Sequence, residues 1–343
     1  MQRLQRRPKV TVAVPNYNYA HFLPDTIGSV LDQSDVEVEV FVIDNASTDD
    51  SVSVIQDMAR NDRRITLLRH EKNLGQMPSF NEGARAGTGE YLVMLCADDM
   101  LTPGSLARAA ALLDACPSVG LVYGYPTTFT SYPPNVSTTA SGWSVWPGRR
   151  WFQERFHDGR NVISSPEVMM RRSVMDQLSY DERIPERADL VLWLRAALRS
   201  DVGRVQGASQ AYHRIHDGRA SVVEYSGLML DFRARLRAFG MVLDDDAELL
   251  PGDAARLRRN LERALAREAF RLARRCLDTG EPIGGSGADD YLRFAAETFP
   301  PITATRGWRS VRRPRPYLRR RGAQQVYRVR HHVQWRLWRR YGV

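Results

Sequence analysis

The chain has 343 residues, of which 43% are hydrophobic and 26% are charged, so it can bury a sizeable core. Its cysteines, Cys96, Cys116 and Cys276, are too few and too scattered for a disulfide framework or a cysteine-based zinc site. No apolar run is long enough to cross a bilayer, and the first residues contain no signal-peptide core. These features exclude a disulfide-stapled secreted domain and a membrane-spanning protein, and predict a cytoplasmic chain.

The formal net charge of +9 is concentrated at one end of the sequence. From Pro301 onward there is no Asp, Glu or Lys, whereas residues 1–300 are near neutral or slightly acidic. Apolar residues in this arginine-rich segment recur at helical spacing, with aromatic residues beside them: Val326, Val329, Val333, Leu337, Trp335, Trp338 and Tyr341. A basic amphipathic helix of this kind is typical of attachment to an anionic membrane surface, here the inner face of the cell membrane. A subunit-docking helix and a disordered basic tail are the alternatives, and no motif predicts nucleic-acid binding.

Strand and helix patterns alternate along the first part of the chain. Short β-branched or apolar runs predict strands at 10–14, 36–43, 65–68, 91–95 and 119–123, and amphipathic runs predict helices at 25–31, 78–86 and 102–115. We interpret Thr102 and Pro103 as the N-cap and first residue of the last of these helices. Strands that are apolar on both faces predict a mainly parallel α/β sheet covered by helices on both sides.

The second part of the chain has a different character. Residues 127–151 are rich in Ser, Thr, Pro, Gly and Trp and are expected to form a long loop, whereas 183–199 contains a helix. Residues 225–299 are expected to form several amphipathic helices with a break at 280–287. The predicted organisation is therefore a catalytic domain at 1–222, a helical extension at 223–300 and a basic tail at 301–343.

Polar residues follow three of the predicted strands, at the sheet edge where parallel α/β folds bind ligands. They form the runs Pro15-Asn16-Tyr17-Asn18, Asp44-Asn45 and Cys96-Ala97-Asp98-Asp99. Adjacent carboxylates after a buried strand are costly without a cation, so Asp98 and Asp99 predict a divalent ion beside a diphosphate. A plain turn that favours aspartate is an equally weighted interpretation of this pair.

Two further aspartates and a His-Arg-Ile-His run complete the set of candidates. Asp44 can accept hydrogen bonds from a nucleobase or ribose, although an Asx turn is the commoner use of such a residue. Asp189 opens a helix and can act as a general base, although an N-cap is the simpler local interpretation. In 211–216, we expect Arg214 to pair with phosphate oxygens, His216 to reach the metal or the diphosphate, and His213 to belong to a surface polar cluster.

Taken in order, these segments resemble the family 2 glycosyltransferases with a GT-A fold, over roughly the region from Lys9 to Ser221. The matching segments are Ala13-Val14-Pro15-Asn16-Tyr17-Asn18, Val42-Ile43-Asp44-Asn45-Ala46-Ser47-Thr48-Asp49, Asn73-Leu74-Gly75 through Asn81, Leu95-Cys96-Ala97-Asp98-Asp99, Asp189-Leu190-Val191-Leu192-Trp193-Leu194-Arg195 and Gln210-Ala211-Tyr212-His213-Arg214-Ile215-His216. No single segment is decisive, but the ordered set is specific.

The resemblance implies a nucleotide-diphosphate-sugar donor, a divalent metal (Mn²⁺ or Mg²⁺) and inversion at the anomeric carbon. By matching positions, Asp44 would contact the base, Asp98 the ribose and Asp99 the metal, while Asp189 would be the catalytic base. The nucleotide-sugar site would also include Pro15, Asn16, Tyr17, Asn73, Asn81 and Arg214, and His216 would assist Asp99 at the metal. The acceptor is left as a glycan, a lipid-linked molecule or a small molecule.

This sequence departs from the family pattern at two positions. Cys96 stands where many members have an aspartate, and Val191 stands where many have a second acid. A catalytically inactive nucleotide-binding or scaffold protein of the same fold is therefore the alternative hypothesis. A nucleotidyltransferase is disfavoured, because Pro15-Asn16-Tyr17 occupies the place of a glycine-rich phosphate loop.

Overall fold

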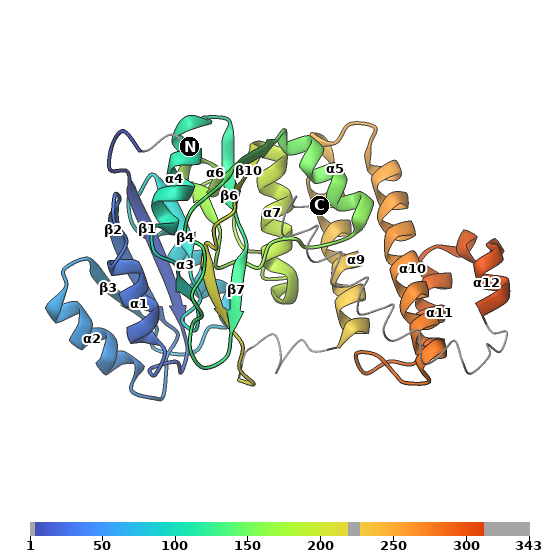
Figure 1. Ribbon diagram of the computed structural model, residues 1–343, viewed down its shortest axis with the longest axis horizontal. Coiled ribbons are helices and arrows are strands. Elements are labelled where there is room, and N and C mark those ends of the chain that lie inside the picture. The colour runs from blue at the N-terminus through green and yellow to red at the C-terminus, as the bar shows by residue number, and fades with distance from the viewer. Residues whose placement is uncertain (1–3, 219–226, 312–343) are drawn as a thin grey trace. The chain divides into compact units, whose positions relative to one another are not determined.

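The computed structural model describes residues 4–218 and 227–311, which fall into two compact units (Figure 1). The first unit is Met1–Trp151 with Val162–His216, and the second is Phe152–Asn161 with Asp217–Val343. The observed boundary at residue 216 lies close to the predicted boundary at 222, but the assignment of 152–161 to the second unit was not predicted. The predicted tail helix lies almost wholly in 312–343, outside the described residues.

A mostly parallel sheet forms the centre of the first unit, as predicted. Its strand order is β3-β2-β1-β4-β9-β6-β10-β8. The strands are β1 (Lys9–Asn16), β2 (Glu37–Asp44), β3 (Ile65–Arg69), β4 (Tyr91–Met94), β6 (Val119–Tyr123), β8 (Gly142–Trp146), β9 (Met169–Arg171) and β10 (Asp201–Gln206). Parallel pairing joins β1 to β2 and β4, β2 to β3, and β6 to β10, whereas β8 and β9 pair antiparallel with their neighbours.

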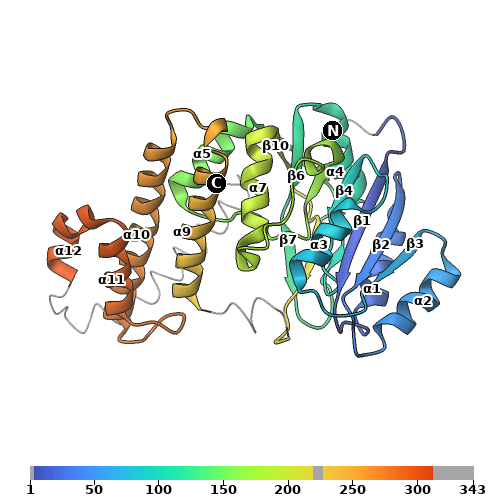
Figure 2. The ribbon, with the colours of Figure 1, turned by 180° about the vertical axis from the view of Figure 1, so that it is seen from behind.

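Helices cover both faces of this sheet (Figures 1 and 2). Alternate residues of a strand point to opposite faces, so Val10, Val12 and Val14 of β1 join a core with α1 (Leu23–Leu31), α2 (Ser51–Asn61) and α4 (Ser105–Ala115). Ala13 instead faces α3 (Gln76–Arg85), and Trp193 of α7 (Ala188–Arg199) packs beside Leu92 and Met94 on this second face. The short helix α6 (Arg172–Met175) and the 3-10 turn η1 (Pro185–Arg187) complete this side.

A second, small sheet connects distant parts of the chain at the carboxyl edge of the main sheet. It contains β5 (Met100–Leu101), β11 (Ala211–Arg214) and β7 (Pro126–Phe129), with β11 in the middle. In the antiparallel register, Tyr212 pairs with Met100. The predicted His-Arg-Ile-His run is thereby placed directly beside the residues that follow β4.

Two predictions about local structure need correction. The helix predicted from Thr102 begins at Ser105, because the Thr102 hydroxyl donates to the carbonyl of Ser209 (2.6 Å) and Gly104, with φ +71°, is the N-cap. The region predicted as a loop at 127–151 contains most of β7, all of β8 and the start of α5 (Gly148–Asp158). Strand β8 pairs with β10, which lies some sixty residues further along the chain. Local sequence cannot reveal such a partner.

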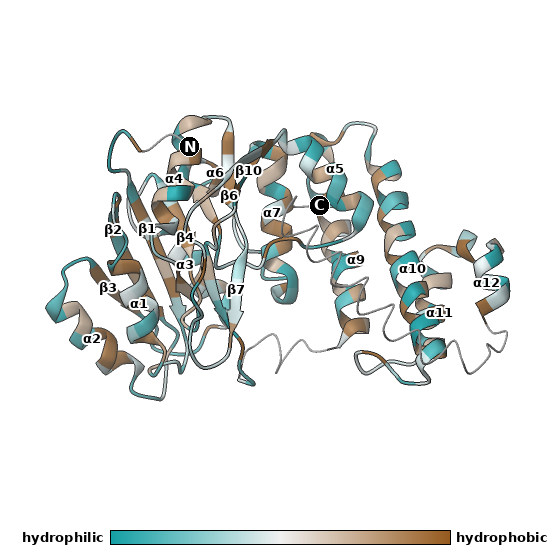
Figure 3. Cartoon of the chain, viewed as in Figure 1, coloured by the Kyte–Doolittle hydropathy of each residue, from teal (hydrophilic) through white to brown (hydrophobic). Residues whose placement is uncertain are grey.

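The second unit is helical, as predicted. It contains α9 (Leu228–Asp245), η2 (Ala247–Leu249), α10 (Ala254–Thr279), α11 (Ala288–Thr298), η3 (Pro300–Ala304), α12 (Arg306–Val311) and the end of α5. Along α10, hydrophobic and hydrophilic residues occupy different sides of the helix (Figure 3). The predicted break after residue 279 is confirmed, since α10 ends at Gly280 in the left-handed region.

Segment 152–161 belongs to this helical unit through buried contacts. Phe156 lies edge-on to Phe239 of α9, with ring centroids 4.7 Å apart. The buried Arg235 of α9 donates to the carbonyl of Gly159 (2.8 Å) and forms an ion pair with Glu268 of α10 (3.0 Å). No helix in the part of the chain that the structure describes has the length and apolar character needed to cross a bilayer.

Candidate active site

A tight turn follows β4 at the carboxyl edge of the main sheet. The amide of Leu95 still pairs with the carbonyl of Ala13 (2.9 Å), and the amide of Asp99 then donates to the carbonyl of Cys96 (3.0 Å). A turn of four residues brings its first and last residues close together. The potential ligand atoms of Cys96, Asp98 and Asp99 consequently lie within 4.8 Å of one another.

The two carboxylates in this turn are buried next to each other. Asp98 is 7% exposed and Asp99 is 2% exposed. Burial and then the neighbouring charge of Asp99 raise the pKa of Asp98, although a hydrogen bond from His216 opposes this effect. Like charges in a buried place are stabilised by a cation, and oxygen ligands suit Mg²⁺ or Mn²⁺. The donor set therefore fits the predicted divalent ion.

Two histidines hold these carboxylates in place. Nδ1 of His213 lies 3.0 Å from Oδ1 and 3.1 Å from Oδ2 of Asp99, and Nε2 of His216 lies 3.0 Å from Oδ2 of Asp98. The expectation that His213 belongs to a surface cluster is therefore wrong, because β11 directs its side chain to the turn. His216, predicted to assist at the metal, contacts Asp98 through its ring nitrogen and packs against Tyr19 and Phe22.

Arg214, predicted to pair with phosphate oxygens, contacts the turn after β4. Its amide donates to Oδ1 of Asp99 (2.9 Å), and its Nε donates to the carbonyl of Asp98 (3.0 Å). Its guanidinium lies between the rings of Phe22 and Phe129, 4.4 and 4.6 Å from their centroids. The side chain is buried, and its Nη2 also forms an ion pair with Asp25 (3.2 Å), so its polar atoms are engaged within the protein.

The loops that follow β1 and β2 are joined by Asp44 and Asn16. Asp44 is fully buried; its Oδ1 accepts from the amide of Ser47 in an Asx turn (3.0 Å), and its Oδ2 accepts from Nδ2 of Asn16 (2.9 Å). Among the described residues, Oδ1 of Asn16 is buried without a hydrogen-bond partner. The structure therefore shows the Asx turn that was the alternative for Asp44, its base contact stays a prediction, and Asn16 offers an unsatisfied acceptor beside it.

A third loop is tied to this pair through Asn45. Its Nδ2 donates to Oδ1 of Asn73 (2.9 Å) and to the carbonyl of Gly75 (3.0 Å), while its Oδ1 accepts from the amide of Leu74 (2.9 Å). Leu74 is 45% exposed, and Tyr17, beside Pro15 and Asn16 at the end of β1, is 44% exposed. The polar loops therefore present apolar side chains to solvent at the edge where a nucleotide is expected.

Asp189 lies in the first turn of α7, where the helix dipole stabilises a negative charge. Burial raises the pKa of the Tyr180 phenol, and the charges of Cys96 and Asp189 raise it further. The role of Asp189 as the catalytic base stays a prediction.

Asn81, predicted to contact the donor, is used by the protein itself. Its Nδ2 donates to the carbonyl of Tyr180 (3.0 Å), and its Oδ1 accepts from the amide of Tyr180 (2.7 Å). Asn81 is 7% exposed, and these two bonds fix the backbone of Tyr180. Tyr180 was not predicted as a site residue, because no local pattern marks a tyrosine that is held by a residue 99 positions away.

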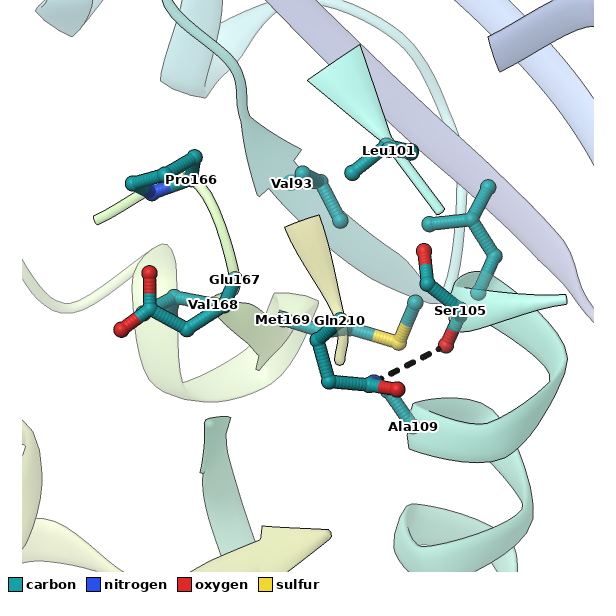
Figure 4. A pocket seen from close by; sticks show the side chains of 10 residues that line it. Val93, Leu101, Ser105, Ala109, Pro166, Glu167, Val168, Met169 and Gln210 are labelled. Carbon is teal, nitrogen blue, oxygen red and sulfur yellow. Dashed lines mark hydrogen bonds between the residues drawn. The ribbon is translucent and has the colours of Figure 1, made fainter. Parts of the chain in front are cut away.

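Glu167 is a buried carboxyl group that was also not predicted. It lines a pocket with about 190 Å³ of empty space, together with Val93, Leu101 and Gln210 (Figure 4). Oε1 accepts from the amide of Ser164 (2.8 Å), and Oε2 has no hydrogen-bond partner among the described residues. Burial raises the pKa of Glu167 to about 7. The pocket is small and mostly apolar, so it is not the site of a nucleotide-sugar.

Comparisons with known proteins agree with this architecture. Residues 11–178 match the family described as "Glycosyl transferase family 2". The structure of residues 1–349 of S. aureus TarS in complex with UDP-GlcNAc superimposes with a TM-score of 0.61 and 17% identity, covering 93% of this chain and 91% of that one. This similarity establishes the fold.

Curated relatives match over shorter stretches. An uncharacterized glycosyltransferase from Nostoc sp. is 35% identical over 115 residues, which are 34% of this chain and 36% of that protein. The putative teichuronic acid biosynthesis glycosyltransferase TuaG from Bacillus subtilis is 34% identical over 93 residues, which are 27% of this chain and 37% of TuaG. The chain thus spans a little over a third of the length of these relatives.

The fold and the site define an α/β protein of the GT-A class, with carboxylates gathered at the carboxyl edge of its sheet. Through residues 11–178, the chain belongs to glycosyl transferase family 2.

Proposed function

We propose that this chain is an inverting, metal-dependent glycosyltransferase that moves a sugar from a nucleotide-diphosphate-sugar donor to an acceptor hydroxyl. The observation that carries the proposal is the turn after β4, in which Cys96, Asp98 and Asp99 bring potential metal ligands within 4.8 Å of one another. Asp189, in the first turn of α7, is the proposed base. A reaction at the anomeric carbon needs such a base opposite the leaving diphosphate.

The loops after β1 and β2 are proposed to bind the nucleotide. Asn16 and Asp44 would recognise the base or the ribose, Tyr17 would cover the base, and Asn73 would keep its loop closed through Asn45. Asp98 would accept from a ribose hydroxyl. Asn81 and Arg214 support the site by holding Tyr180 and the turn, and do not themselves contact the donor in this proposal.

Asp99 and its neighbours in the turn would hold a divalent ion, which supplies positive charge for the leaving diphosphate when it is bound. Asp189 would accept the proton of the attacking hydroxyl. One carboxylate is sufficient, because a diphosphate leaves without protonation, whereas glycoside hydrolysis usually needs two carboxyl groups. The missing second acid at Val191 is therefore compatible with transfer.

Asp189→Asn tests the role of the base. The amide cannot accept the proton, so we expect donor binding within about twofold of the unaltered protein and a loss of transfer of at least about a hundredfold. Binding is measured by the thermal shift with nucleoside diphosphates plus Mn²⁺, and transfer by nucleoside diphosphate release from a panel of nucleotide-sugars. The exposed Glu182→Gln is the matched control and should change neither. Full turnover by Asp189→Asn would remove Asp189 from the mechanism.

A role in cell-envelope glycan synthesis is part of the proposal. It is supported by the relative whose name refers to teichuronic acid biosynthesis and by the arginine-rich sequence beyond residue 300. Such a sequence would bring the active site to an anionic membrane surface that carries the acceptor. The protein is accordingly proposed to be cytoplasmic and peripheral at the inner face of the cell membrane.

A further inference from the structure

Cys96 lies at the place where the proposed metal site is built. The turn that joins its carbonyl to the amide of Asp99 gathers Sγ of Cys96 with the carboxylates of Asp98 and Asp99 within 4.8 Å. Two ligands on opposite sides of one ion are separated by about twice a 2.0–2.4 Å bond. The spacing therefore fits a single ion held by Cys96 and Asp99, with Asp98 beside it.

The imidazoles nearby are already used to orient the carboxylates. His213 hydrogen-bonds to both oxygens of Asp99, and His216 hydrogen-bonds to Asp98. Ring nitrogens that hold ligating carboxylates act as outer partners of a metal site. The remaining potential donor atom of the cluster is the thiol of Cys96.

We propose that Cys96, as a thiolate, is a ligand of the divalent ion in this turn, which presupposes the metal-dependent reaction proposed above. On binding, the S–H bond breaks, a sulfur–metal bond forms and the proton is released to solvent. A mixed sulfur and oxygen set is softer than an all-oxygen set. The site consequently favours Mn²⁺, Co²⁺, Zn²⁺ or Cd²⁺ over Mg²⁺.

Titration of the full chain with Co²⁺ tests the ligand without reference to activity. A thiolate bound to Co²⁺ gives a sulfur-to-metal charge-transfer band in the near ultraviolet, and we expect this band to saturate at one equivalent. Cys96→Ser should abolish the band, whereas the controls Cys116→Ser and Cys276→Ala should keep it. A band that survives in Cys96→Ser, or Co²⁺ that binds to the unaltered chain without a band, overturns the proposal.

Cys96→Asp provides a second variant in which the turn keeps three potential donors. We expect its affinity for Mg²⁺ relative to Co²⁺ to rise about tenfold, measured by competition, because a carboxylate suits the harder ion. An unchanged ratio overturns the proposal, and circular dichroism verifies that the variant is folded. Metal-stimulated transfer without a charge-transfer band would refute only the thiolate ligand. A band at one equivalent without transfer from any donor would support the ligand and refute the proposed enzyme activity.

Discussion

Glu167 is a single residue whose ionisation opposes folding. Burial raises its pKa from the ordinary value of 4.5 to about 7, so the folded protein holds a proton that the unfolded chain releases between these two pH values. The unfolded state then binds fewer protons, and the free energy of unfolding falls as pH rises through this window. The total loss is on the order of 3 kcal/mol, complete above about pH 7.

Glu167→Gln should remove this pH dependence. We expect the variant to gain stability relative to the unaltered protein between pH 4.5 and pH 8, by an amount on the order of 3 kcal/mol, measured by urea unfolding at both values. The exposed Glu71→Gln is the control and should follow the unaltered protein. If the stability difference for Glu167→Gln is the same at both pH values, the carboxyl does not titrate in this range.

At the scale of a single helix, the packing of α3 against the sheet depends on Gly83. A methyl group at this position would approach Cβ of Ala13 and Cδ1 of Ile43 to 2.9 Å each. Gly83→Ala should therefore destabilise the protein by about 1–3 kcal/mol through overpacking, in spite of the higher helix propensity of alanine. The measurement is the shift in Tm.

Gly28 of α1 provides the matched control for Gly83. A methyl group there would meet nothing within 4 Å, so Gly28→Ala should stabilise by about 0.5–1 kcal/mol. Opposite signs at these two helical glycines are expected. If Gly83→Ala also raises Tm, α3 does not pack against β1 as closely as described.

The helices and strands also show what local sequence can predict. Strands β1, β4 and β6 were predicted correctly, because each is a short, mostly apolar run that is buried on both faces, and β2 because its valines recur at every second position. The edge strand β8 was missed: its residues are mostly half-exposed and it pairs with a strand far along the chain. Periodicity reports burial, and it does not identify a partner.

At the site, the sequence predicted the loops better than the contacts within them. Asp44, Asp98, Asp99 and Asp189 were chosen because each follows a strand or opens a helix, and these positions are local. The use of Asn81 to hold Tyr180, and of His213 to hold Asp99, depends on packing between residues roughly a hundred positions apart. Such pairings follow only from the three-dimensional fold.

At the scale of the whole molecule, a chain that ends at Val311 tests membrane attachment. It lacks eleven arginines of the basic tail but keeps the stacking of Trp308 on Phe270 and the buried Val311. We expect the full chain to co-sediment with vesicles that contain anionic phospholipid, and the shortened chain to remain in solution. An equal Tm for both chains verifies intact packing. Equal vesicle binding by both chains would contradict a membrane role for the tail.

Because residues 152–161 belong to the helical unit, cutting the polypeptide at one position cannot separate the two units. The polypeptide passes between them after Trp151, after Asn161 and after His216. Deleting everything beyond His216 would remove Phe239 of α9, the ring that packs against Phe156, and would expose the apolar end of α5 to solvent. Exchange of helical units between relatives, whether by recombination or in the laboratory, must therefore carry two non-adjacent pieces of gene together.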